Sequence, residues 1–107
     1  MEHEYEKFVD SMLLPTARSL EYLVLGLCSE AGEVASKLKK IIRDTWILSV
    51  GREYKRSILM ELGNVLFYTT AIANYHGFTL QKVIAANKEK LTARKEKGTI
   101  SGEGDSR

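Results

Sequence analysis

Two short segments of this chain, EAGEV at 30–34 and ELGNV at 61–65, share the pattern Glu-x-Gly-(acid or amide)-Val. In each segment the first and fourth side chains carry oxygen. An i, i+3 spacing places two side chains on one face of a helix, so each segment would present a pair of oxygen ligands. If two such helices pack antiparallel, the two pairs converge. The four side chains are Glu30, Glu33, Glu61 and Asn64.

Each segment also has a central glycine, Gly32 in the first and Gly63 in the second. A glycine inside a helix costs about 1 kcal/mol relative to alanine. Because this cost is met twice at matching positions, it needs a physical reason. Close approach of the two helices, or of the backbone to a ligand, is the simplest, since glycine has no Cβ.

Three adjacent carboxylates repel one another unless they are protonated or neutralised. A hard divalent cation neutralises them, and Mg²⁺ and Mn²⁺ prefer oxygen ligands. Neither segment contains His, and Cys28 is the single cysteine, which argues against a zinc site. We therefore expect Mg²⁺, or Mn²⁺ in its place, as the cofactor. The competing interpretation is a solvated i, i+4 pair of Glu33 with Lys37 on a helix surface.

The elements that would position these residues are helices, because apolar residues recur at 3.6-residue intervals in four stretches. The first ends before Pro15, the second starts near Thr16 as N-cap, and Thr79 caps the fourth. Gly77 is the expected C-cap residue of the third. We expect Cys28 to be buried. The four stretches are about residues 5–12, 16–43, 53–76 and 79–97.

No segment shows sustained period-two alternation, so no sheet is predicted, and the two long middle helices should pack antiparallel. Phe67 and Tyr75 are expected in the core. The predicted fold class is all-α, an antiparallel bundle of about four helices that oligomerises through the long central helices. Residues 1–97 would form the helical domain, and the Gly- and Ser-rich segment 98–107 a C-terminal tail.

Composition excludes several classes of function. The chain has 107 residues, 44% of them hydrophobic, with a net charge of +2. No stretch is long enough to span a bilayer, and the acidic N-terminus MEHEYEKF lacks a signal peptide's apolar region, so a cytoplasmic location is expected. Residues 88–97 are basic, but a nucleic-acid polymer needs a broader basic stripe. A local basic patch near carboxylates fits a small polyanion bridged by metal ions.

The ordered set of motifs resembles the MazG-like nucleoside triphosphate pyrophosphohydrolases of the all-α NTP pyrophosphatase superfamily, particularly the short single-domain forms of bacteria and phages. Their hallmark is Glu-x-x-Glu on one helix followed by Glu-x-x-Asp on the next, and the corresponding segments here are residues 30–33 and 61–64. The likeness covers most of the chain. It includes Leu25-Gly26-Leu27, Lys39-Lys40, Asn87-x-x-Lys90-Leu91-x-x-Arg94 and Gly102-x-Gly104-Asp105-x-Arg107.

The resemblance implies hydrolysis of a (d)NTP to a (d)NMP and pyrophosphate by attack at the α-phosphorus. Metal ions on the four oxygen ligands would acidify a water, and Glu30 or Glu33 would be the catalytic base. Cations would hold the β- and γ-phosphates, and aromatic side chains the base and sugar. The candidate substrate-binding residues are Lys37, Lys40, Trp46, Tyr68, Asn87, Lys90 and Arg94. The competing readings are a solvated basic helix end and, for Trp46, an anchor at a subunit interface.

One position departs from the family pattern: Asn64 stands where the family has Asp. An amide oxygen still ligates a cation, but it brings no negative charge. The alternative function is therefore a catalytically impaired relative that binds nucleotides as a sensor. The resemblance also implies a homodimer or homotetramer, in which a neighbouring subunit or the tail completes each active site.

Overall fold

The chain forms four α-helices and one short 3₁₀ helix in a computed structural model, which describes residues 3–45 and 51–98. No strand occurs in these two ranges, so the predicted all-α class is confirmed. Trp46 and the tail from residue 99 onward lie outside the described residues. The elements are α1 (Glu4–Met12), η1 (Pro15–Ala17), α2 (Leu20–Thr45), α3 (Arg52–Tyr75) and α4 (Leu80–Lys97).

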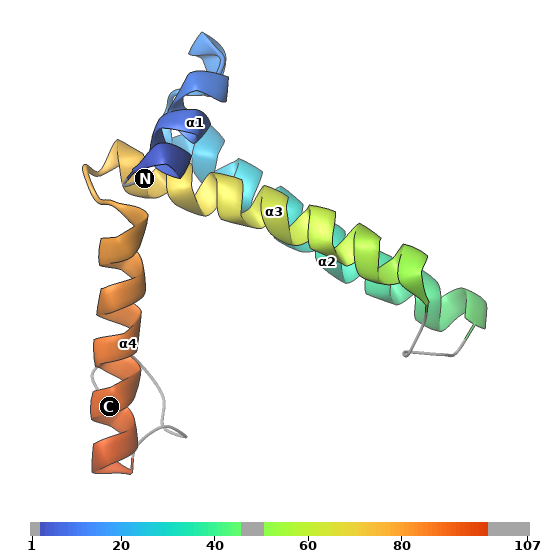
Figure 1. Ribbon diagram of the computed structural model, residues 1–107. Coiled ribbons are helices and arrows are strands. Elements are labelled where there is room, and N and C mark those ends of the chain that lie inside the picture. The colour runs from blue at the N-terminus through green and yellow to red at the C-terminus, as the bar shows by residue number, and fades with distance from the viewer. Residues whose placement is uncertain (1–2, 46–50, 99–107) are drawn as a thin grey trace.

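Helices α2 and α3 lie side by side and run antiparallel, as predicted, to form one long hairpin (Figure 1). Helix α1 packs against α3 at the end of the hairpin that is opposite the α2–α3 connection. The buried core lies at this end, where Val9 of α1 meets Leu23 of α2 and Ala71 of α3. The amide of Asn74 donates to the carbonyl oxygen of Glu6 at 3.0 Å and fastens α1 to α3.

The ends of the helices follow local capping chemistry, with one difference from the prediction. Thr16 does not cap α2, because Pro15 starts a 3₁₀ turn that includes it; Ser19 caps α2 instead and accepts the backbone N–H of Tyr22 at 3.1 Å. Gly77 ends α3 with φ 78°. The predicted Thr79 cap is confirmed, and its Oγ1 accepts the N–H of Lys82 at 3.1 Å.

Helix α4 leaves the hairpin at the Gly77 corner and projects away from it (Figure 1). Its first turn is tied to α1, because Glu6 Oε2 accepts the backbone N–H of Leu80 at 3.0 Å. The radius of gyration is 16.9 Å, whereas a compact domain of this length has about 13 Å. The four helices are therefore present, but α4 does not lie along the hairpin.

This open arrangement corrects two predictions about the core. Cys28 is exposed rather than buried, because it lies on the side of α2 away from α3. Tyr75 is 54% exposed, since α4 turns away just after it, while Phe67 packs against the core as expected. Within the described ranges, no helix has the length and apolar character needed to cross a membrane.

Candidate functional site

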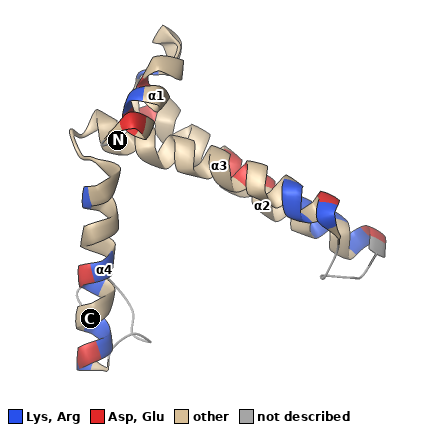
Figure 2. Ribbon diagram, in the orientation of Figure 1, with Lys and Arg blue, Asp and Glu red and all other residues tan. Residues whose placement is uncertain are grey.

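The two motif segments lie opposite each other, about midway along the hairpin. Acidic positions appear there in Figure 2, and basic positions lie closer to the α2–α3 connection. Glu30 and Glu61 are half-buried at the α2–α3 interface, whereas Glu33 and Asn64 are exposed beside it. Antiparallel packing places all four side chains on one side of the hairpin, which we call the carboxylate face.

The two motif glycines do not lie where the helices meet. A Cβ added to Gly32 or Gly63 would meet no described atom within 4 Å. The prediction that these glycines let α2 and α3 close together is therefore wrong. Helix geometry gives the reason: each glycine lies roughly half a turn around its helix from the residues that face the other helix. Approach of a ligand or neighbour to the backbone remains the other explanation.

The close approach occurs instead at Gly26, one turn before Glu30. A Cβ at Gly26 would lie within 2.6 Å of the ring carbons Cδ1 and Cζ of Tyr68. The ring of Tyr68 on α3 therefore rests directly on the backbone of α2. Burial raises the pKa of the Tyr68 hydroxyl, and its hydrogen-bonding partner Tyr22 and nearby Glu30 add to this. Tyr68 thus lies beside the first motif glutamate.

The sequence predicts Tyr68 as a substrate-binding residue, but it does not predict the residues that hold Tyr68 in place. The family motif includes Gly26, but it does not predict that Gly26 and Tyr22 contact Tyr68. A usable signal was present, since Gly26 is a glycine inside an apolar helical stretch and lies one turn from both Tyr22 and Glu30. This signal does not identify the side chain that fills the space above Gly26, because Tyr68 belongs to another helix.

Glu61 is the most strongly engaged carboxylate of the motif. Its Oε1 lies 3.8 Å from Nζ of Lys37, and its Oε2 accepts a hydrogen bond from Nδ2 of Asn64 at 3.5 Å. Its side chain is 14% exposed. Lys37 thus forms its ion pair across the helix interface, with Glu61, rather than along α2 with Glu33.

The chemistry of these donors fits a hard divalent cation, because every candidate ligand is an oxygen. Within residues 3–45 and 51–98, no three His, Cys, Asp or Glu side chains lie close enough together to hold a metal ion. Glu61 faces Asn64 and Lys37 instead. Metal binding would therefore require rearrangement of side chains on the carboxylate face.

The predicted substrate-binding residues fall into two groups. Lys37, exposed Lys40 and Tyr68 belong to the hairpin, near the carboxylates. Asn87, Lys90 and the buried Arg94 belong to α4. Since α4 runs away from the hairpin, the structure does not bring this second group to the carboxylates of the same chain (Figure 1).

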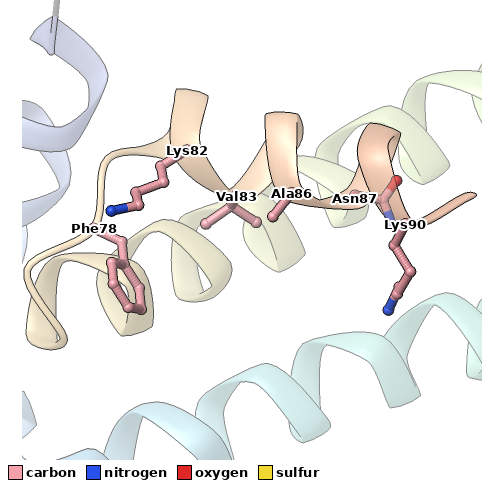
Figure 3. A pocket seen from close by; sticks show the side chains of 6 residues that line it. All are labelled: Phe78, Lys82, Val83, Ala86, Asn87 and Lys90. Carbon is pink, nitrogen blue, oxygen red and sulfur yellow. The ribbon is translucent and has the colours of Figure 1, made fainter. Parts of the chain in front are cut away.

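Asn87 and Lys90 instead line a pocket along α4 (Figure 3). Phe78 closes one end of it, and Nζ of Lys82 lies 5.5 Å from the centre of the Phe78 ring. Val83 and Ala86 form the apolar wall between these ends.

A basic region at the connection end of the hairpin includes residues that sequence reasoning missed (Figure 2). Arg52, Lys55 and Arg56 lie in the first turns of α3 and line a pocket together with Leu59. Helix periodicity places these three residues on the side of α3 that carries Leu59, away from Glu61 and Asn64, so they do not extend the carboxylate site.

Comparisons with known proteins identify the family to which the chain is similar. The family model described as MazG nucleotide pyrophosphohydrolase domain matches residues 18–99. A protein of Mycobacterium phage L5 named Gene 37 protein is 41% identical over 88 residues, which are 82% of this chain and 76% of that protein. No solved structure matches the chain.

Proposed function

This chain belongs to the MazG nucleotide pyrophosphohydrolase family, and we propose that it hydrolyses a (d)NTP to a (d)NMP and pyrophosphate in a metal-dependent reaction. Such a reaction uses a water that attacks the α-phosphorus, while the bond to the α–β bridging oxygen breaks. The observation that carries the proposal is the carboxylate face, where Glu30, Glu33, Glu61 and Asn64 line one side of the α2–α3 hairpin.

In this proposal the four oxygen ligands would hold Mg²⁺ or Mn²⁺, which would neutralise phosphate charge and help to activate the attacking water. Glu30 or Glu33 accepts the proton of the attacking water. Lys37 and Lys40 are close enough along α2 to balance the charge that develops on the leaving pyrophosphate. Tyr68, whose ring rests on the backbone of α2 beside Glu30, would contact the sugar. A (d)NTP substrate would be consistent with the expected location in the cytoplasm of a bacterium or of a phage-infected cell.

We propose further that the working unit is a homodimer or homotetramer. One side of the hairpin, opposite the carboxylate face, carries exposed apolar side chains. We call this the apolar face, and it consists of Val24, Leu38, Ile42, Leu59, Leu62 and Leu66. On each helix these residues lie roughly half a turn from the motif side chains. Monomeric proteins rarely leave so extended an apolar surface in water.

Assembly would also complete the active site. Asn87, Lys90 and Arg94 lie on α4, which runs away from the carboxylates of its own chain. The α4 of a second copy would bring these polar and cationic groups to the carboxylate face. Their family-matched positions and their distance from the site in one chain together support this arrangement.

A second candidate function rests on Asn64. Its amide donates a hydrogen bond to Glu61, which an ionised Asp could not do, and this occupies an oxygen that would otherwise bind metal. The alternative is therefore a nucleotide-binding relative with impaired catalysis.

Turnover of a panel of (d)NTPs separates these functions. With Mg²⁺ or Mn²⁺, we expect monophosphate and pyrophosphate as products, and Glu33→Gln should reduce turnover by at least about a hundredfold, as loss of an acid–base or metal ligand does. Asn64→Asp should increase it. No turnover by the natural chain, with turnover gained by Asn64→Asp, would identify the impaired relative. No turnover by either would contradict the proposed reaction.

A further inference from the structure

One oxygen of the Glu61 carboxylate accepts a hydrogen bond and the other lies in an ion pair, and both partners come from its own chain. Nζ of Lys37 lies 3.8 Å from Oε1, and Nδ2 of Asn64 lies 3.5 Å from Oε2. Lys37 comes from α2, whereas Glu61 and Asn64 come from α3. One cation and one amide therefore hold in place a carboxylate that lies at the interface of the two helices.

The side chain of Glu61 is more deeply buried than that of Lys37. The Glu61 side chain is 14% exposed, and that of Lys37 is 39% exposed. A carboxylate largely shielded from water needs a positive charge nearby, since water cannot solvate it fully. The half-exposed lysine can move into solvent at little cost, because its long side chain has many rotamers.

We propose that Lys37 is the resident counter-ion of Glu61, which stabilises this carboxylate in the metal-free protein and is displaced from it when a divalent cation binds. The inference rests on the proposed metal-dependent function. An ammonium group and a metal ion compete for the same oxygen, and two cations side by side repel each other. Metal binding must therefore break the ion pair between Lys37 and Glu61. The free-energy cost of breaking it lowers the metal affinity of the protein.

Substitution of Lys37 tests this through metal affinity and stability, without any activity assay. Lys37→Met keeps the length of the side chain and removes its charge. Because the competing cation is gone, Mn²⁺ should bind about five- to tenfold more tightly, as the loss of a partly buried ion pair implies. Lys39→Met is the matched control, since Lys39 is exposed on the same helix and points away from α3. The measurement is calorimetric titration with Mn²⁺.

A double-mutant cycle in EDTA tests the ion pair itself. Lys37→Met and Glu61→Gln should each lower the free energy of unfolding, and the double variant should lose less than the sum. Additive losses would overturn the ion pair. Equal Mn²⁺ affinities of Lys37→Met and Lys39→Met would overturn the displacement. If no variant binds Mn²⁺ while the cycle still shows coupling, the proposed metal site fails and the displacement with it, but the counter-ion contact stands.

Discussion

Three glycines of the hairpin differ in what surrounds them. Gly26 lies under the ring of Tyr68, whereas Gly32 and Gly63 have no described atom in the space where a Cβ would go. All three have helical backbones without a positive φ. Only Gly26 therefore needs to be glycine for the packing of the single chain.

Alanine at these positions should change stability in opposite directions. Gly26→Ala should lower the free energy of unfolding by about 1–3 kcal/mol, because the new methyl group displaces the Tyr68 ring. Gly32→Ala should raise it by about 1 kcal/mol through helix propensity alone. Urea denaturation in EDTA measures both. A Tyr68→Ala background provides the control, in which the penalty of Gly26→Ala should disappear. A stabilising effect of Gly26→Ala in the natural background would contradict the contact.

At this scale the sequence predicts residue types better than contacts. The spacing of Glu30, Glu33, Glu61 and Asn64 predicts that they share one face, because helix periodicity fixes direction. The contact of the Tyr68 ring with Gly26 could not be predicted, because it depends on how α2 and α3 are aligned along each other and joins two residues far apart in sequence. The same is true of the pairing of Lys37 with Glu61 in place of Glu33.

Among the elements, α4 is joined to α1 by a hydrogen bond to the carboxylate of Glu6. Glu6 Oε2 accepts the N–H of Leu80, the first residue of α4. This hydrogen bond is the main reason that the pKa of Glu6 lies below its ordinary value of 4.5, with smaller contributions from its own backbone N–H and from His3. A carboxylate at a helix N-terminus also interacts favourably with the helix dipole.

The lowered pKa predicts acid sensitivity at this junction. Because the folded-state pKa is below the unfolded value, ionised Glu6 stabilises the fold fully above pH 4.5, and the contribution is lost as the pH falls through the folded pKa. Thermal denaturation from pH 7 to pH 3 should therefore show the natural chain converging in stability with Glu6→Gln at the acid end. Glu89→Gln, on an exposed part of α4, is the control and should run parallel to the natural chain. A constant gap for Glu6→Gln would contradict the prediction.

The elements themselves were largely predictable. The start of α4 at Thr79 and the end of α3 at Gly77 follow from capping chemistry, which is local. The start of α2 was predicted too early, because Pro15 directs a 3₁₀ turn before Ser19 can act as cap. The direction of α4 could not be predicted, since the Glu6–Leu80 contact spans 74 residues.

The molecule as a whole is more open than its length requires. Its radius of gyration exceeds that of a compact domain, and α4 stands apart from the hairpin. Two features support a second copy in the proposed function. The apolar face is exposed in a single chain, and Asn87, Lys90 and Arg94 of α4 lie far from the carboxylate face of their own chain. A two-fold assembly would use the same surface on both chains and would form two equivalent active sites.

Mixing two inactive variants tests this assembly. Glu33→Gln removes a carboxylate of the hairpin, and Lys90→Ala removes a cation of α4. If each site combines the hairpin of one chain with the α4 of another, a mixed dimer contains one intact site. Refolding the two variants together should then restore about a quarter of the natural turnover, given random pairing of two-fold dimers.

Leu62→Glu, introduced into both variants, places a charge on the apolar face where Leu62 is 52% exposed. It should abolish the recovery and give monomers in sedimentation equilibrium, whereas Leu25→Glu, an exposed position outside the apolar face, should do neither. Variants that assemble like the natural chain and yet recover no turnover on mixing would show that each chain builds its own site.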